Sequence, residues 1–213
     1  MTGVIDYGAG NLFSLIGGIK AAGGEAKVTS DTRELAACDE IILPGVGAFR
    51  PAMERLEAMK LDKFIRDYAH GGGRLLGICL GMQLLFERSF EFGETKGLGL
   101  IGGDVLPLRS DETVRRLGLK VPHIGWNSLK IVKDHPLTAD IADGDFVYYV
   151  HSFFAPVGEY ATATSEYGAT VCGIAAAGTV AGCQFHPEKS GEAGLKILGA
   201  FVTKRKQITA QTR

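Results

Sequence analysis

A cysteine that could act as a nucleophile stands at the end of an apolar run, residues 75–78. Glycines lie two positions before and two positions after Cys79, at Gly77 and Gly81. This pattern predicts a strand, a sharp turn and a helix, which is the geometry of a nucleophile elbow with cysteine in place of serine. The glycines suit such a turn because its neighbours have no room for a Cβ. The alternative is an inert, buried cysteine at the end of a packed strand.

A base and a group that orients it are present near the end of the chain. His186 and Glu188 stand two positions apart, with Pro187 between them. A thiolate nucleophile needs a base, and a carboxylate can hold that base in one tautomer and stabilise its cation. The proline keeps His186 out of the α region, which predicts a stiff, extended turn. We therefore expect Cys79, His186 and Glu188 to form a catalytic triad, although the tripeptide alone also fits a surface turn.

The front half of the chain predicts the scaffold that must position the cysteine. Strands are expected over residues 4–7, 25–30, 39–43 and 74–78, and helices over residues 11–22, 51–70 and 80–87. The last of these helices would place Cys79 at its N-terminus, where the partial positive charge of the helix favours a thiolate. Alternating strands and helices predict a parallel sheet with helices on both faces.

The back half of the chain is expected to consist mainly of short strands. They cover residues 98–108, 129–132, 145–154, 161–165, 171–177 and 179–185, and a helix follows over residues 191–204. Some of these strands should pair antiparallel because short turns join them. The predicted fold is thus a three-layer α/β protein with a mostly parallel sheet, helices on both faces and antiparallel strands in the C-terminal half. We expect one domain over residues 1–204 and a flexible, basic tail over residues 205–213.

Composition narrows the function classes. The 213 residues are 46% hydrophobic and 22% charged, as in an ordinary soluble domain, and the net charge of −1 gives no electrostatic case for nucleic acid or an anionic membrane. We find no signal peptide and no apolar run of about eighteen residues, so a cytoplasmic location is expected. A glycine-rich segment over residues 6–11 has Phe13 where a dinucleotide fingerprint needs a third glycine, which argues against nucleotide binding.

The cysteine pattern fits a reducing compartment. The four cysteines are Cys38, Cys79, Cys172 and Cys183, and no two have the spacing of a zinc-binding pair. Cys172 and Cys183 are expected in core strands, with a disulfide between them as the minor alternative. No His, Asp or Glu cluster has ligand spacing either, so no metal is expected.

The two motifs together resemble a known family. Residues 77–83 and 186–188, in this order, are similar to the class I, triad-type glutamine amidotransferases. Members of that family hydrolyse the side-chain amide of glutamine and pass the ammonia to a synthase partner. Residues 5–12, 44–49, 122–127, 148–153 and 184–190 narrow the resemblance to the glutaminase subunits of imidazole glycerol phosphate synthases, in histidine biosynthesis. The resemblance covers residues 5–201 and implies glutamine as substrate, no cofactor, and a heterodimer with a (β/α)₈ synthase subunit.

Hydrolysis of an amide by a thiolate passes through an oxyanion that needs hydrogen-bond donors. The elbow supplies the N–H of Leu80, directly after the nucleophile. The resemblance implies that Val46 and Gly47, in a glycine-rich segment that follows a predicted strand, provide the second donor. An ordinary glycine turn is the alternative for that segment.

Other residues are expected to hold the substrate. Gln83 lies one helical turn after the nucleophile and can reach the site. Glu91 follows the elbow helix, where its carboxylate could pair with the α-amino group of glutamine. The resemblance implies that backbone groups of His151, Ser152 and Phe153 also hold glutamine.

Four residues are expected at the surface that meets the partner. The resemblance places Asn11 and Trp126 on this surface, although a lone tryptophan is most often a core residue. Lys189 is expected to form a salt bridge across the interface, and His123 is interpreted as an interface or loop residue. The resemblance also implies that glutaminase activity stays low until the partner binds its own substrate.

Three alternative functions are compatible with parts of this sequence. The chain could serve a different ammonia-dependent synthase, but residues 122–127 argue against that. It could be a stand-alone cysteine hydrolase that acts on peptides without a partner. A non-catalytic scaffold is the remaining class, and it would have no need to keep Cys79, His186 and Glu188 together.

Overall fold

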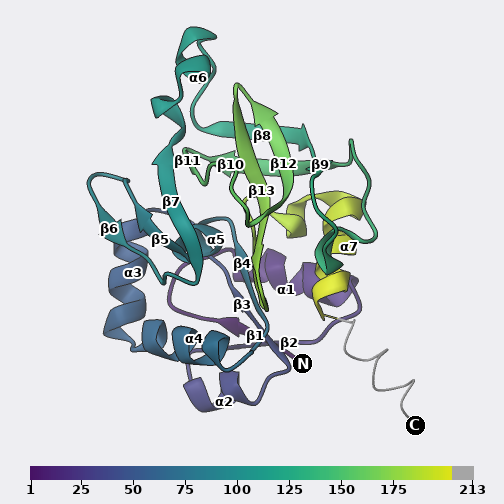
Figure 1. Ribbon diagram of the computed structural model, residues 1–213. Helices are drawn as coiled ribbons and strands as arrows, with labels where there is room; N and C mark the ends of the chain where they lie inside the picture. The colour runs from purple at the N-terminus through teal and green to yellow at the C-terminus, as the bar shows by residue number, and fades with distance from the viewer. Residues whose placement is uncertain (203–213) are drawn as a thin grey trace.

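The computed structural model describes residues 1–202, which are built around an eight-stranded sheet (Figure 1). The strand order is β2-β1-β3-β4-β14-β13-β12-β9. The first five of these strands pair in parallel and the last three are antiparallel additions, which confirms the predicted fold class. The strands are β1 (Thr2–Ile5), β2 (Ala26–Thr29), β3 (Glu40–Leu43), β4 (Leu75–Ile78), β9 (Lys130–Ile131), β12 (Ala161–Tyr167), β13 (Ala169–Ala177) and β14 (Val180–Cys183).

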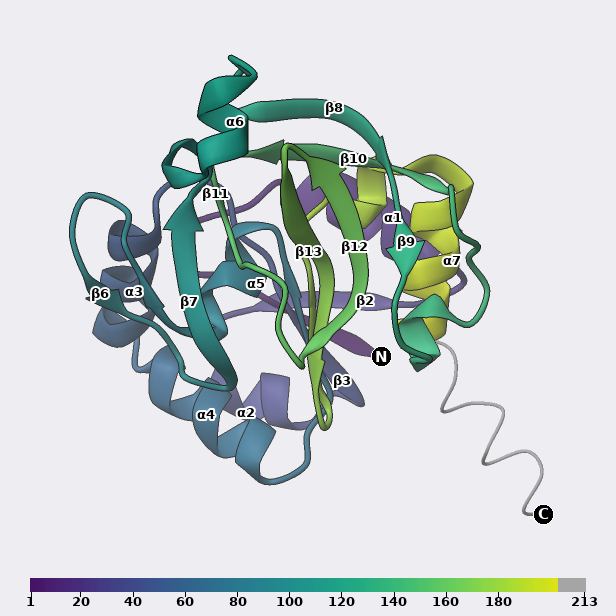
Figure 2. The ribbon, with the colours of Figure 1, turned by 45° about the horizontal axis from the view of Figure 1, so that its top comes forward.

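Helices cover both faces of this sheet, as Figure 2 shows. The helices α1 (Leu12–Ala21) and α7 (Gly191–Val202) pack on one face, whereas α2 (Thr32–Ala36), α3 (Phe49–Ala58), α4 (Leu61–His70) and α5 (Leu80–Leu84) pack on the other. Along β3, Ile41 and Leu43 enter one core and Ile42 enters the other. Successive side chains of a strand point to opposite faces, so a sheet covered on both sides needs apolar residues at every position.

Two smaller sheets extend the sheet's antiparallel half. One has the order β11-β7-β5-β6 and the other pairs β10 with β8. Their strands are β5 (Phe86–Ser89), β6 (Thr95–Lys96), β7 (Ile101–Pro107), β8 (His123–Ser128), β10 (Phe146–His151) and β11 (Phe153–Phe154). Short helical segments complete the described chain: η1 (Leu108–Ser110), α6 (Glu112–Arg116), η2 (Pro136–Thr138) and η3 (Pro187–Lys189).

The expected helix over residues 80–87 is shorter than predicted. It ends at Leu84, and β5 begins at Phe86. The reason is non-local, because the carbonyls of Leu84, Leu85 and Phe86 accept hydrogen bonds from N–H groups of residues 98–101 instead of from the next helical turn. These bonds tie the end of the elbow helix to the start of β7.

Other predictions also need correction. The single helix expected over residues 51–70 is two helices, because Lys60 adopts a left-handed φ of 58° between them. Residues 123–128, for which no strand was expected, form β8, and the strand expected over residues 145–154 is divided at Ser152 into β10 and β11. The short helix α2 was not predicted. Residues 203–204 of the expected last helix and the tail over residues 205–213 lie outside the described residues.

The cysteines of the chain are free thiols, so the alternative of a Cys172–Cys183 disulfide is wrong. Within residues 1–202, none of the helices has both the length and the apolar character needed to cross a membrane. The same residues contain no group of three or more His, Cys, Asp or Glu side chains placed to hold a metal ion.

Candidate active site

Cys79 occupies a strained turn between β4 and α5. Its φ of 54° and ψ of −111° lie in a region that residues with a Cβ rarely adopt. Strain of this kind persists only where the surrounding structure enforces it, and it is common at active sites. The turn presents the thiol at the carboxyl end of a parallel strand, where open α/β sheets place their ligand sites.

The packing of the elbow explains its glycines. A Cβ on Gly81 would lie 1.9 Å from the carbonyl oxygen of Leu43, at the end of β3. A Cβ on Gly77 would lie 2.6 Å from the carbonyl oxygen of Gly81. The elbow therefore packs backbone against backbone, and it brings the residues that follow β3 alongside Cys79. This confirms the steric reason for which glycine is expected at both positions.

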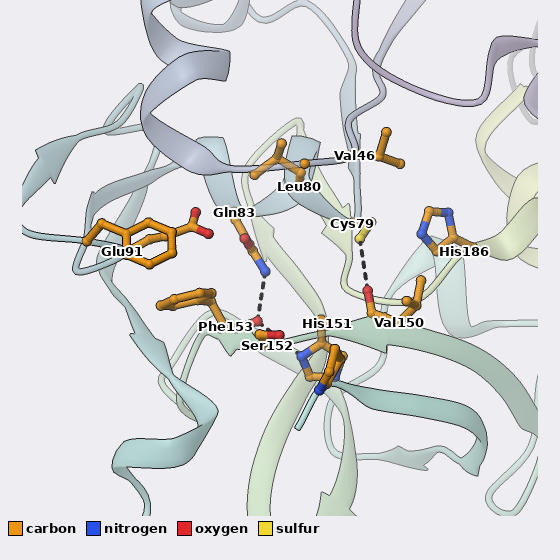
Figure 3. Close-up of a pocket in the computed structure, with 13 residues that line it drawn as sticks. Val46, Cys79, Leu80, Gln83, Glu91, Val150, His151, Ser152, Phe153 and His186 are labelled. Carbon is orange, nitrogen blue, oxygen red and sulfur yellow. Dashed lines mark hydrogen bonds between the residues drawn. The ribbon is translucent and has the colours of Figure 1, made fainter. Parts of the chain in front are cut away.

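A cavity of about 410 Å³ opens beside the thiol (Figure 3). It is lined by Val46, Gly47, Cys79, Leu80, Gln83, Glu91, Phe92, Pro122, Val150, His151, Ser152, Phe153 and His186. The structure thus brings together every residue expected in the catalytic, oxyanion and substrate groups except Glu188, which lies behind His186. Three lining residues were missed. Pro122 and Val150 belong to segments that carried the resemblance, whereas Phe92 had no signal in the sequence.

His186 and Glu188 form a buried pair with a defined tautomer. The His186 Nδ1 lies 2.8 Å from Glu188 Oε1, and because a carboxylate accepts, Nδ1 is the nitrogen that carries the proton. The turn is extended at His186, with φ −96° and ψ 97°, as the proline predicts. The other ring nitrogen, Nε2, is buried and has no hydrogen-bond partner within residues 1–202. Figure 3 shows this ring beside Cys79, so Nε2 is available to the thiol proton.

The surroundings of His186 favour its cation. Burial by itself would lower the pKa of this imidazole, but its interactions with Cys79 and Glu188 outweigh burial and raise the pKa to about 9. An imidazolium next to a cysteine favours the thiolate, the form of cysteine that acts as a nucleophile. In this structure the Cys79 Sγ lies 3.8 Å from the Val150 carbonyl oxygen, within hydrogen-bond reach for sulfur.

Glu188 is placed by a residue that sequence reasoning missed. A Cβ on Gly18, in α1, would lie 3.0 Å from the Cβ of Glu188 and 3.0 Å from Leu198 Cδ1. The missing side chain lets η3 approach the helix. The signal available in the sequence was a pair of adjacent glycines inside a predicted helix, where glycine is unfavourable without a packing reason.

The expected oxyanion residues meet at one side of the cavity. Leu80 is the first residue of α5, directly after Cys79. Val46 and Gly47 follow β3, and Gly47 has a φ of 103°, which favours glycine. This segment is held at its start by Tyr7, whose hydroxyl donates a hydrogen bond of 2.9 Å to the Pro44 carbonyl.

The expected substrate residues are themselves tied into the protein. Gln83 is buried, and its Nε2 donates to the Phe153 carbonyl at 2.8 Å and to Gln184 Oε1 at 3.1 Å. Glu91 accepts a hydrogen bond of 2.6 Å from the N–H of Phe49 through one carboxylate oxygen. Both side chains line the cavity and also fix the positions of its walls.

His123 is not at the surface, which corrects the expectation of an interface or loop residue. It is 3% exposed and lies in β8, stacked between Tyr149 and Tyr167 at ring-centre distances of 4.8 and 3.9 Å. Its Nδ1 lies 3.0 Å from the Nε2 of His151. The sequence did not predict β8, so it contained no signal for this contact.

The other three residues expected to meet a partner are exposed. Asn11 caps α1 by accepting a hydrogen bond from the N–H of Ser14, and Lys189 lies in η3 just after the triad. Trp126 is 54% exposed on β8 and makes an edge contact with Tyr148. The lone tryptophan is therefore a surface residue and not part of the core.

Comparisons with known proteins agree with this geometry. The chain is 48% identical over 202 residues to "Imidazole glycerol phosphate synthase subunit HisH" of Bacillus cytotoxicus, covering 94% of this chain and 93% of that protein. It is 47% identical over 203 residues to the subunit of the same name from Caldanaerobacter subterraneus subsp. tengcongensis, covering 94% and 97%.

Solved structures show the same fold at lower identity. "Crystal structure of glutamine amidotransferase" superimposes with a TM-score of 0.70 and 18% identity over 93% of this chain and 98% of that one. "Structure of PurLQS from Thermotoga maritima" gives a TM-score of 0.70 and 21% identity over 96% and 98%.

The family assignment follows from the elbow, the buried His–Glu pair and the match in sequence. Residues 3–204 match the family model described as "Glutamine amidotransferase class-I". That match spans nearly the whole chain and includes every residue that lines the cavity beside Cys79. The chain belongs to the class I glutamine amidotransferases.

Proposed function

We propose that this chain is the glutaminase subunit of an imidazole glycerol phosphate synthase, and that it hydrolyses L-glutamine to glutamate and ammonia. The observation that carries the proposal is one cavity that contains a strained cysteine and the free nitrogen of a histidine whose other nitrogen is bonded to a buried carboxylate. The relatives named HisH, at 47–48% identity over almost the full chain, support the assignment to histidine biosynthesis.

The residues of the cavity define the steps of the reaction. The Cys79 thiolate attacks the side-chain carbonyl carbon of glutamine, and the His186 imidazolium gives its proton to the departing ammonia. A thioester remains on the sulfur. His186, now neutral, removes a proton from water, which attacks the thioester and releases glutamate. N–H groups of Leu80 and of the Val46–Gly47 segment stabilise the oxyanion in both steps.

The same cavity holds the rest of the substrate. The Glu91 carboxylate pairs with the α-ammonium group of glutamine, and backbone groups of residues 151–153 hold its backbone end. Glu91 and Phe153 lie on the side of the cavity opposite His186 in Figure 3, so the amide end of a bound glutamine points toward Cys79.

The exposed residues around the site support a protein partner. We infer that Trp126, Asn11 and Lys189 face a (β/α)₈ synthase subunit in a heterodimer, with Trp126 as the apolar anchor. Ammonia then passes into that subunit instead of into solvent. The segment over residues 44–47 is the switch, with one donor misdirected until the partner binds its own substrate. Residues 1–204 act as one domain, and the free cysteines suit a cytoplasmic setting.

The test is glutamine hydrolysis by the chain alone, with a purified (β/α)₈ synthase subunit, and with that subunit plus its phosphoribosyl substrate. We expect a low rate that rises sharply only in the complete mixture. Cys79→Ala should lower the stimulated rate at least about a thousandfold and Glu188→Gln about a hundredfold to ten-thousandfold. Cys38→Ala, at a cysteine far from the cavity, is the control and should leave it unchanged. A Cys79-dependent rate that ignores this partner would contradict the assigned synthase.

A second experiment tests the interface. Trp126→Ala should weaken binding of the synthase subunit at least about tenfold, because large exposed aromatics are common hot spots. Lys189→Ala should change affinity less than about fivefold, as exposed ion pairs contribute little. Met59→Ala is the control, since this exposed residue lies between α3 and α4, away from β8 in both ribbon views. Equal affinity for all three variants would place the interface elsewhere.

A further inference from the structure

We propose that His123 is a positioning residue for the glutamine site, and that it forms with His151 a hydrogen-bond relay of fixed tautomers that holds the wall over residues 151–153. The role in substrate binding rests on the proposed glutaminase function. The relay itself is a property of the fold. Neither histidine makes a hydrogen bond with Cys79, His186 or Glu188 within residues 1–202, so the relay acts through the wall and not in the chemical step.

The two rings meet because their strands pair in register. His123 and His151 lie directly opposite each other in the antiparallel pair of β8 and β10. Both side chains are buried, at 3% and 5% exposure. The His123 Nδ1 lies 3.0 Å from the His151 Nε2, and the His151 Nδ1 lies 3.0 Å from the carbonyl oxygen of Phe153.

These contacts determine which nitrogens carry protons. A carbonyl oxygen only accepts, so the His151 Nδ1 must donate to Phe153. In a neutral ring the His151 Nε2 is then bare and must accept, which makes the His123 Nδ1 the donor. Both rings are neutral because burial lowers the pKa of His123 to about 4, and burial together with the nearby His123 lowers that of His151 to about 3. The relay therefore runs in one direction, from His123 through His151 to Phe153.

The His123 ring is held by its own surroundings. Tyr149 and Tyr167 stack on it, and each tyrosine hydroxyl is bonded elsewhere, to Ser165 Oγ at 2.9 Å and to the Lys120 carbonyl at 2.8 Å. The His123 ring, whose Nδ1 faces His151, therefore has little freedom to rotate. A ring packed merely to fill the core would not need its nitrogen aimed at a second histidine.

The relay ends on the substrate wall. The Phe153 carbonyl accepts from both His151 Nδ1 and Gln83 Nε2, and the adjacent Ser152 carbonyl accepts from the N–H of Leu108 at 2.8 Å. His151, Ser152 and Phe153 all line the cavity. Removing the His123 donor would leave a buried acceptor on His151 without a partner, and the wall would shift or loosen to satisfy it.

Kinetics of matched variants test the positioning role. His123→Phe keeps an aromatic ring between the tyrosines but removes the donor, whereas His123→Asn places an amide N–H near the position of Nδ1. In the complex with the synthase subunit, His123→Phe should raise KM for glutamine about tenfold, with kcat changed less than about threefold. His123→Asn should bring KM most of the way back to its value in the unmodified chain. Met59→Ala, at an exposed residue between α3 and α4, is the control. The proposal is overturned if His123→Phe raises KM no more than Met59→Ala does.

A spectroscopic measurement tests the relay without turnover. In the ¹⁵N-histidine-labelled chain, long-range ¹H–¹⁵N spectra at pH 7 should show His123 and His151 neutral and protonated at Nδ1, the form less favoured by free histidine. His123→Asn assigns the signals. Protonation at Nε2 in either ring would overturn the relay, even if His123→Phe fails to fold. The expected tautomers in a chain that hydrolyses no glutamine would support the relay and count against the proposed function.

Discussion

The two walls of the cavity are built in different ways. At the elbow, the backbone of Gly81 lies so close to the Leu43 carbonyl that no side chain fits between them. At the opposite wall, the Phe153 carbonyl is held by side chains of Gln83 and His151. The position of Cys79 therefore depends on side chains that are missing at two glycines, whereas the position of the wall over residues 151–153 depends on hydrogen-bond donors.

This difference predicts how each wall responds to change. A side chain added at Gly81 would collide with the backbone oxygen of Leu43. Only a movement of β3 away from α5 relieves that collision, and this movement disturbs the centre of the sheet. A lost donor costs about 1–3 kcal/mol and affects one carbonyl. Substitutions at the elbow should therefore disrupt the packing of the sheet as a whole. Substitutions at the wall over residues 151–153 should lower the free energy of unfolding by smaller, graded amounts.

The largest expected effect is at Gly81. Gly81→Ala should lower the free energy of unfolding by at least about 4 kcal/mol, because its Cβ would lie 1.9 Å from a backbone oxygen. Urea denaturation followed by circular dichroism measures this change. Gly102→Ala, in β7 with no atom within 4 Å of the new Cβ, is the matched control and should stay within about 0.5 kcal/mol of the unmodified chain. A stable Gly81→Ala variant would remove the contrast between the walls.

His186 lies beside Cys79, and its contribution to the free energy of unfolding should depend on pH. Because folding raises the pKa of its imidazole from 6.5 to about 9, the stabilisation is fully present below pH 6.5 and is lost as the pH rises through about 9. We expect a loss of roughly 1–3 kcal/mol over this window. In Cys79→Ala the interaction with the sulfur is absent, so the loss of stability should cover a narrower pH range. Urea denaturation at several pH values measures the free energy of unfolding of the unmodified chain and of this variant. Identical pH profiles would show that Cys79 does not raise the pKa of His186.

The substrate wall should respond to Gln83 by a smaller amount. Gln83→Met keeps the approximate shape of the side chain but removes its hydrogen bonds to Phe153 and Gln184. We expect a loss of about 2 kcal/mol in the free energy of unfolding, with a folded protein and a raised KM for glutamine. A variant that unfolds completely would mean that this wall is as intolerant as the elbow.

The smallest expected effect comes from two adjacent glycines of α1. Gly17→Ala meets no atom within 4 Å, so it should raise the free energy of unfolding by about 0.5–1 kcal/mol. Gly18→Ala meets the Cβ of Glu188 at 3.0 Å, so it should lower stability by about 1 kcal/mol and reduce glutamine hydrolysis. Thermal unfolding measures the stability of both variants, and an assay of glutamine hydrolysis measures their activity. Equal behaviour of both variants would show that Gly18 does not place Glu188.

The sequence was sufficient to predict the elbow at Cys79 and the pairing of His186 with Glu188, because both arrangements are mostly local. The elbow needs a strand, a glycine on each side of Cys79 and a helix start, all within a few residues. The orientation of His186 by Glu188 needs only one stiff turn around a proline. Such features follow from steric limits on the backbone, and these apply whatever the rest of the chain does.

The tertiary structure alone decided the features that depend on distant pairing. The elbow helix stops at Leu84 because residues 98–101 provide other donors for its carbonyls. His123 is a buried partner of His151 and not a surface residue, because β8 and β10 pair in a register that places the two rings opposite each other. The register of two strands depends on which faces the whole core buries, and no short segment of sequence contains that information.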